Sequence, residues 1–222
     1  LEILKFQSAL ALQCFTNEYI YNQSEHEKSA LAVLEEVVRE TLLTGEQPNP
    51  QYILCLASYR ALNQYEWCDL VTTNSDIEEV FMRQVIEPRR EKSLRSNIPT
   101  LKEITDTVSS KVRNQYESSP YPRWVDTALC IESAPISKVV NELQLKLFNP
   151  AINNVEFPKI LIAGCGTGDQ VILASRYKNA QITAIDLSSS SLAYAIRKTN
   201  EYEMDNVTFK QMDLLNIAEL GV

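Results

Sequence analysis

A glycine-rich run is the strongest candidate for chemistry in this sequence. Gly164-Cys165-Gly166-Thr167-Gly168 follows a short apolar stretch and precedes a helical pattern. Glycines at this spacing let the backbone turn sharply and let a ligand approach the main chain closely. A helix that begins after such a turn offers unpaired N–H groups and a partial positive charge. The run therefore predicts a ligand site built from backbone groups, with a purely structural strand-to-helix turn as the alternative.

The spacing of the glycines indicates the kind of ligand. Loops that bind the pyrophosphate of a dinucleotide follow the pattern G-x-G-x-x-G. The third glycine of that pattern would stand at position 169, which is occupied by Asp169. A carboxylate at the mouth of a phosphate site would repel the ligand. Spacing and charge therefore favour a cofactor without phosphates and argue against a nicotinamide-dependent oxidoreductase.

Two acidic residues follow the next two apolar stretches. Asp186, eighteen residues after Gly168, precedes Leu187. A carboxylate there can accept two hydrogen bonds from the 2′- and 3′-hydroxyls of a ribose, although capping of the next helix is the plainer role. Asp213 follows Met212 at the end of the third apolar stretch. At that edge Asp213 can accept a hydrogen bond from an adenine amino group, and Met212 and Leu214 can pack on the ring. The plainer alternative is that acids are common near strand ends.

A parallel sheet is expected to position these residues. Short strands alternate with helical patterns after Pro158. The expected strands cover 159–163, 181–185 and 207–212, and the expected helices cover 169–177 and 189–203. Such alternation predicts parallel strands joined by right-handed crossovers.

The N-terminal part of the chain reads as helices. Three capping boxes predict helix starts: Ser24 with Glu27, Ser75 with Glu78, and Thr100 with Glu103. The last two open expected helices over 76–87 and 101–117, and a further helix is expected over 51–64. No internal repeat of about 34 residues is visible, so no tetratricopeptide array is inferred from the residues.

Two prolines separate this helical part from the rest. Pro120 and Pro122 in the segment Ser118–Trp124 forbid a helix and favour an extended, stiff chain. A short helix over 136–148 and a polar loop over 149–156 are expected to follow.

We therefore expect an α plus α/β fold. A helical domain covers 1–117, a linker or lid with a short helix covers 118–156, and the N-terminal part of a Rossmann-like, doubly wound parallel sheet covers 157–222.

Composition excludes several classes of function. The net charge is −8 and the pI about 4.9, which argues against general binding of nucleic acid or of anionic membranes. No apolar run is long enough to span a bilayer. The single histidine and the five widely spaced cysteines predict neither a metal site nor a disulfide framework: Cys14, Cys55, Cys68, Cys130 and Cys165. Reduced thiols in a cytoplasmic protein are expected.

Taken together, the motifs resemble those of class I S-adenosylmethionine-dependent methyltransferases. The resemblance rests on Ile160–Gly168, then Ala184-Ile185-Asp186-Leu187-Ser188, then Gln211-Met212-Asp213. In that family the glycine loop wraps the methionine part of the cofactor, the acid after the second strand holds the ribose, and the acid after the third meets the adenine. The resemblance implies S-adenosyl-L-methionine as cofactor. More loosely, the layout resembles bacterial members with a helical, tetratricopeptide-like N-terminal region, in which a segment like Tyr116–Trp124 leads into the catalytic domain.

Two features depart from the family pattern. Many members carry an acid two residues before the first glycine, where this chain has Ile162. The family fold has seven strands, and three are recognised here. We therefore expect the catalytic fold to be incomplete, the first strand to be left as an unpaired edge, and the chain by itself to be inactive.

The expected function is methyl transfer to an unidentified acceptor, a small molecule or a protein. The reaction needs positioning more than acid–base groups, and no catalytic residue is assigned. Cys165 is expected to be a small turn residue rather than a nucleophile. Tyr121 and Trp124 are interpreted as packing anchors, with ligand contact as the alternative. The alternative function is a scaffold that binds a protein partner through its helical domain and keeps a vestigial cofactor domain.

Overall fold

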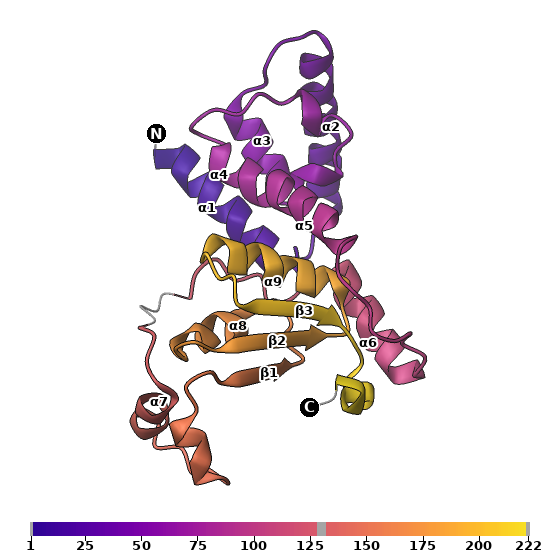
Figure 1. Cartoon of the computed structure of the whole chain (residues 1–222). Coiled ribbons are helices and arrows are strands. Elements are labelled where there is room, and N and C mark those ends of the chain that lie inside the picture. The colour runs from indigo at the N-terminus through magenta and orange to yellow at the C-terminus, as the bar shows by residue number, and fades with distance from the viewer. Residues whose placement is uncertain (1, 128–131, 221–222) are drawn as a thin grey trace. The chain divides into compact units, whose positions relative to one another are not determined.

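The structure is a computed structural model that describes residues 2–127 and 132–220, so Cys130 lies outside it. The chain divides into two compact units: residues 1–90, here called the helical unit, and residues 91–222, here called the α/β unit (Figure 1). The expected helical stretch 1–117 is therefore shared between the two units. Among the described residues, no helix is both long and apolar enough to cross a membrane.

The helical unit is built from short helices linked by tight turns. Its elements are α1 (Glu2–Thr16), α2 (Glu25–Leu43), α3 (Pro50–Ala57), the 3-10 segments η1 (Leu62–Gln64) and η2 (Cys68–Leu70), α4 (Glu78–Phe81) and the π-helical turn η3 (Met82–Ile86). The next helix, α5 (Glu87–Arg95), contains the boundary between the units. The expected helix 51–64 thus ends early, at Ala57, and the chain turns before η1.

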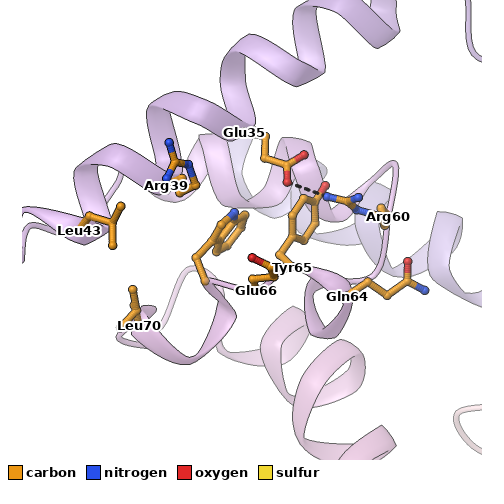
Figure 2. Close-up of a pocket in the computed structure, with 9 residues that line it drawn as sticks. Glu35, Arg39, Leu43, Arg60, Gln64, Tyr65, Glu66 and Leu70 are labelled. Carbon is orange, nitrogen blue, oxygen red and sulfur yellow. Dashed lines mark hydrogen bonds and ion pairs between the residues drawn. The ribbon is translucent and has the colours of Figure 1, made fainter.

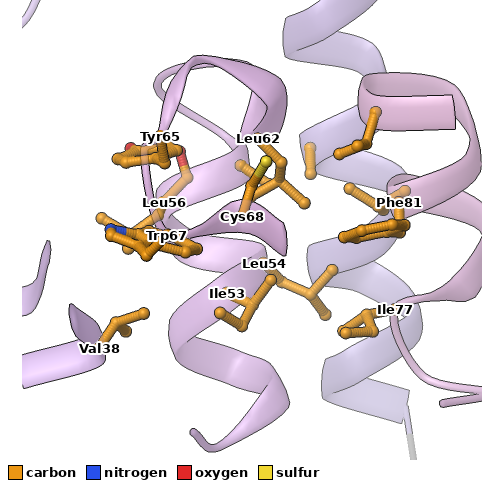
Figure 3. Packing of buried hydrophobic residues seen from close by; sticks show 14 of the residues in the cluster. Val38, Ile53, Leu54, Leu56, Leu62, Tyr65, Trp67, Cys68, Ile77 and Phe81 are labelled. Atoms are coloured by element: carbon orange, nitrogen blue, oxygen red, sulfur yellow. The ribbon is translucent and has the colours of Figure 1, made fainter. Parts of the chain in front are cut away.

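An apolar cluster of buried side chains holds the helical unit together (Figure 3). Gln84, carried by the π-helical turn, is a fully buried polar side chain within this unit. Its amide oxygen accepts a hydrogen bond from Leu62 N–H at 3.0 Å. Its amide nitrogen donates to the carbonyl oxygens of Ala11 (3.2 Å) and Ala57 (3.0 Å). One side chain thereby ties α1, α3 and η1 to the turn, and its burial is offset by these three bonds.

One of the three predicted capping boxes is present. The Ser24 hydroxyl accepts from Glu27 N–H at 3.2 Å, and the Glu27 carboxylate accepts from Ser24 N–H at 2.8 Å, at the start of α2. The box predicted at Ser75 is wrong, because α4 begins at Glu78 after Ile77, without a side-chain cap.

The box predicted at Thr100 is also wrong. Helix α6 (Thr107–Ser118) begins seven residues later, and Asp106 caps it by accepting from Ser109 N–H at 2.8 Å. Thr100 instead forms a parallel bridge with Gln211, so its backbone is extended. Pairing with the distant Gln211 therefore outweighs the local capping-box pattern at Thr100.

The α/β unit contains the expected parallel sheet. Strands β1 (Lys159–Ala163), β2 (Gln181–Asp186) and β3 (Val207–Gln211) pair in the order β1-β2-β3. Helices α8 (Asp169–Leu173), extended by the 3-10 turn η5 (Ala174–Arg176), and α9 (Ser189–Glu201) form the crossovers. Both crossovers run the same way across the sheet, so right-handed geometry places α8 and α9 on one face (Figure 1). The predicted fold class, helical region plus α/β, is confirmed.

Shorter elements complete the α/β unit. They are α6, α7 (Ile136–Glu142), the 3-10 helix η4 (Pro150–Asn154) and the 3-10 segment η6 (Leu214–Leu220). The helix expected over 136–148 ends at Glu142, and Gln144 adopts a positive φ of 52° just beyond it. The stretch expected as a loop contains η4, because Asn149 caps it by accepting from Ala151 N–H and Pro150 suits its first position.

Candidate functional site

The glycine run forms the turn between β1 and α8. Gly164, Gly166 and Gly168 adopt positive φ angles of 71°, 52° and 90°, a region that residues with a Cβ rarely occupy. The N–H groups of Gly164 and Cys165 both donate to the Ile185 carbonyl oxygen, at 2.8 and 2.9 Å. The loop is therefore bonded to the end of β2 where it leaves β1.

Two of these glycines differ in their surroundings. A Cβ placed on Gly168 would lie 2.6 Å from the Cβ of Ala195 in α9, so this position must lack a side chain for the loop to pack on the helix. A Cβ placed on Gly166 would meet no atom within 4 Å. The backbone of Gly166 thus faces open space, and this is where a ligand can approach the loop.

Asp186 lies beside the open part of the loop. Its Oδ2 accepts a hydrogen bond from Gly166 N–H and its Oδ1 accepts one from Ser188 N–H, both at 2.9 Å. Each carboxylate oxygen keeps a second lone pair for a further donor. Burial raises the pKa of this carboxyl, against the opposing effect of the two backbone N–H groups. The structure therefore brings together two of the sites predicted from sequence, the glycine loop and Asp186.

The third predicted element lies at the neighbouring strand end. Met212 is 1% exposed, and its N–H donates to the Asp186 carbonyl oxygen at 2.9 Å. Asp213 is 4% exposed, and its Oδ1 accepts from Leu215 N–H at 2.9 Å. Asp213 therefore stabilises the turn into η6 through Oδ1. Its Oδ2 is the oxygen that can accept a hydrogen bond from a ligand.

Gln211 belongs to the third sequence motif, but its side-chain contacts were not predicted. Its side-chain amide donates to the Leu187 carbonyl oxygen at 2.8 Å, and its oxygen accepts from the Thr100 hydroxyl at 2.9 Å. Its backbone N–H also donates to Pro99 at 2.9 Å. Gln211 thus joins the turn after β2 to an extended segment from an earlier part of the chain. A glutamine near a strand end gives no local signal for such a link.

The proline-containing segment packs on the glycine loop. The Thr167 hydroxyl donates to the Pro122 carbonyl oxygen at 2.8 Å, and the Trp124 indole N–H donates to the Thr167 carbonyl oxygen at 3.1 Å. The Trp124 ring also lies edge-on to Tyr194 of α9, with ring centroids 6.2 Å apart. The expected role of Trp124 as a packing anchor is confirmed. Tyr121 is exposed.

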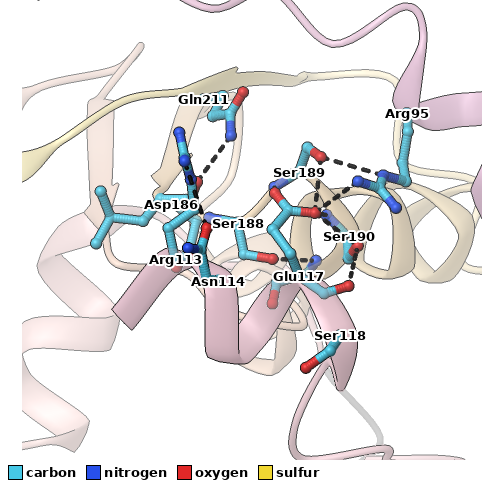
Figure 4. Close-up of polar contacts among 12 residues, drawn as sticks. Arg95, Arg113, Asn114, Glu117, Ser118, Asp186, Ser188, Ser189, Ser190 and Gln211 are labelled. Atoms are coloured by element: carbon cyan, nitrogen blue, oxygen red, sulfur yellow. Dashed lines mark hydrogen bonds and ion pairs between the residues drawn. The ribbon is translucent and has the colours of Figure 1, made fainter. Parts of the chain in front are cut away.

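A carboxylate from α6 meets the first turn of α9 (Figure 4). Glu117 accepts hydrogen bonds from Ser189 N–H at 2.6 Å and Ser190 N–H at 3.3 Å, and Arg95 donates to it at 2.7 Å. Glu117 and Arg95 were not singled out in the sequence, because their partners lie far along the chain.

The remaining side chains of the loop do not suggest covalent or metal chemistry. Cys165 is 3% exposed, and burial followed by the nearby Asp186 charge raises the pKa of its thiol, so the reactive thiolate is disfavoured. Ile162, where many family members carry an acid, packs against the apolar cluster of the α/β unit. Within the described parts of the chain, no group of three or more His, Cys, Asp or Glu residues is arranged to hold a metal.

A separate cavity of about 380 Å³ lies in the helical unit (Figure 2). Arg60 donates to Glu35 at 2.9 Å there, and its guanidinium carbon lies 3.8 Å from the centre of the Tyr65 ring. Tyr65 in turn stacks on Trp67 with centroids 4.6 Å apart. Glu35 and Arg60 of this wall are thus engaged with each other, and none of the predicted site residues lines the cavity.

Comparison with known proteins gives a family match over the region that contains the site. Residues 160–221 match the family model described as a methyltransferase domain. An uncharacterized protein of Synechococcus sp. is 42% identical over 65 residues, which are 28% of this chain and 16% of the relative. The matched region thus spans a small part of that longer protein.

Solved structures show weaker likenesses. One is a coclaurine N-methyltransferase bound to N-methylheliamine and SAH, 15% identical, with a TM-score of 0.27, covering 97% of this chain and 46% of its own. Another concerns conversion of a disulfide bond into a thioacetal group during echinomycin biosynthesis, 22% identical, with a TM-score of 0.31, covering 50% and 42%. At these TM-scores neither carries the argument. The family match thus falls on residues 160–221, the part of the chain that contains the glycine loop, Asp186 and Asp213.

Proposed function

We propose that the α/β unit binds S-adenosyl-L-methionine and that the protein to which it belongs transfers the methyl group to an acceptor. The observation that carries this proposal is the bond between Asp186 and Gly166. It places a carboxylate with free lone pairs beside the one loop glycine whose surroundings are open. A ligand with a hydroxyl pair and an extended polar chain suits this combination.

Different residues would bind different parts of the cofactor. The backbone of Gly164–Gly168 would hold the methionine part, and Asp186 would accept hydrogen bonds from the ribose hydroxyls. Leu187, Met212 and Asp213 would surround the adenine, with the free Asp213 oxygen as acceptor for its amino group. No phosphate needs to be accommodated, which agrees with Asp169 at the first position of α8.

When bound, the cofactor supplies a methyl group on a positively charged sulfur. A lone pair of the acceptor would displace the methyl group from the sulfur, and the electron pair of the carbon–sulfur bond would stay on the sulfur. The leaving group is neutral, so the protein's task is alignment of the two reactants rather than proton transfer to the leaving group. The rigid loop, bonded to β2 and packed on α9, supplies such alignment.

Isothermal calorimetry with S-adenosylhomocysteine and with NAD tests the proposal. We expect binding of S-adenosylhomocysteine and no heat with NAD, because the loop lacks a phosphate-binding pattern. Binding of NAD alone would instead support a dinucleotide enzyme. Binding of S-adenosylhomocysteine by a full-length protein that turns over no acceptor would favour the scaffold alternative.

A further inference from the structure

We propose that Glu117 is a positioning residue for the cofactor site, because its carboxylate holds the turn that carries Asp186. The inference rests on the proposed function for its effect on the cofactor. Its structural part concerns the turn Asp186–Ser189 between β2 and α9 and can be measured without any ligand.

The location of Glu117 is unfavourable for its own helix. It lies in the last turn of α6, where the helix dipole disfavours a negative charge. Its side chain is only 20% exposed. The compensation comes from another helix, because the carboxylate accepts from the N–H groups of Ser189 and Ser190, the first two residues of α9. The N-terminus of a helix is where such a charge is stabilised.

The capping of α9 is divided between two side chains. Ser188, the N-cap, accepts from Ser191 N–H at 3.1 Å and leaves the first two N–H groups to Glu117. The hydroxyls of Ser189 and Ser190 also donate to Glu117, at 3.1 and 2.8 Å. Glu117 is therefore bonded to the start of α9 by four donors, more than a single helix cap needs.

The start of α9 is in turn bonded to the cofactor site. Ser188 N–H donates to Asp186 Oδ1, and Asp186 Oδ2 accepts from Gly166 N–H. A continuous path of hydrogen bonds and one short turn thus runs from Glu117 to the open glycine (Figure 4 shows its first part). A displacement of the turn would move both acceptor oxygens of Asp186.

Arg95 completes the arrangement. Its guanidinium donates to Glu117 at 2.7 Å and to the Ser189 hydroxyl at 3.1 Å. Burial alone would raise the pKa of Glu117, but the hydrogen bonds from Ser190 and Ser189 and the charge of Arg95 lower it. The group therefore stays charged, as an acceptor of several hydrogen bonds must.

Amide hydrogen exchange in the ligand-free chain tests the structural part. Glu117→Ala should speed exchange at Gly166 and Ser188, besides Ser189 and Ser190, by roughly fivefold or more. Glu117→Gln keeps one acceptor and should give a smaller effect at the same four amides. Asp106→Ala is the matched control, because it removes the carboxylate cap of α6 itself and should leave these four amides unchanged.

Titration with S-adenosylhomocysteine tests the consequence for the cofactor. Glu117→Ala should weaken binding roughly fivefold to tenfold, with Glu117→Gln intermediate and Asp106→Ala at the wild-type value. Faster exchange confined to Ser189 and Ser190, with unchanged binding, would reduce Glu117 to a helix cap and overturn the inference. If the wild-type chain binds no S-adenosylhomocysteine, the proposed function fails, while exchange at Gly166 and Ser188 still decides the role of Glu117. If Glu117→Ala does not fold, the same exchange and binding measurements on Glu117→Gln test the inference.

Discussion

Asp186 Oδ2 accepts a hydrogen bond from the backbone N–H of Gly166, 2.9 Å away. This bond joins the end of β2 to the loop after β1, and it orients a half-buried carboxylate toward the open side of that loop. Four of the predictions that follow concern this junction and the loop around it.

Removal of the Asp186 carboxylate should weaken cofactor binding. Asp186→Ala is expected to raise the dissociation constant for S-adenosylhomocysteine at least tenfold, about 1.4 kcal/mol, because the ribose hydroxyls lose their acceptor. Asp205→Ala is the matched control, since Asp205 is an exposed acid before β3. An unchanged dissociation constant in a folded Asp186→Ala protein would show that Asp186 does not bind the ribose.

Cofactor binding should weaken on acidification at a higher pH than an ordinary aspartate would give. Burial raises the pKa of Asp186 above its usual 3.8, so the charged acceptor is lost as the pH falls through this raised value. Binding of S-adenosylhomocysteine measured between pH 7 and 4 should decline with this titration. Asp186→Asn should bind S-adenosylhomocysteine weakly, and its binding should depend less on pH. An equally steep decline in that variant would assign the titration to another group.

Replacing Gly168 or Gly166 with alanine should lower the unfolding free energy by different amounts. In Gly168→Ala the new Cβ would lie 2.6 Å from the Cβ of Ala195, and the backbone at this position has a positive φ. We therefore expect a loss of about 3 kcal/mol in unfolding free energy. Gly166→Ala has open space around it and should lose only the conformational cost, about 1–2 kcal/mol. Urea unfolding of the α/β unit measures both. Equal losses would show that packing on α9 does not set the requirement for Gly168.

The proline segment should become less accessible when the cofactor binds. Trp124 and Pro122 contact Thr167 directly, so a ligand that orders the glycine loop should also order this segment. Tryptic cleavage after Arg123 is expected to slow in the presence of S-adenosylhomocysteine, with cleavage after Lys28 in the helical unit as the internal reference. The same rate with and without ligand would show that the segment packs on the loop without responding to it.

The helical unit should depend on Gln84 for stability. Gln84→Ala leaves the Leu62 N–H without its side-chain acceptor in a buried site and removes a donor from the carbonyl oxygens of Ala11 and Ala57, the latter keeping the Tyr19 hydroxyl. We expect a loss of about 2–4 kcal/mol in unfolding free energy. Gln64→Ala, an exposed glutamine in η1, is the control and should change little. A loss below about 1 kcal/mol for Gln84→Ala would mean that the core closes around the gap or that water replaces the amide.

Local sequence patterns predicted some helix starts and failed at others for an identifiable reason. The box at Ser24 is formed because both partners lie on the exposed start of a long amphipathic helix, where nothing competes. The same pattern at Thr100 is overruled by pairing with Gln211, which lies 111 residues away. A capping box contributes about 1 kcal/mol, so a few tertiary hydrogen bonds are enough to displace it.

By itself the sequence determined the three strands, their order in the chain and the glycine turn, since these depend on residues adjacent along the chain. It also indicated Asp186 as the acid beside that turn, because carboxyl ends of neighbouring parallel strands meet at one edge. Only the tertiary structure decided that Glu117 and Arg95 meet the start of α9, and that Gln211 joins the turn after β2 to the extended segment at Thr100. Those contacts join residues distant in sequence, and their energies depend on burial and on the approach of helix ends, which no local pattern records.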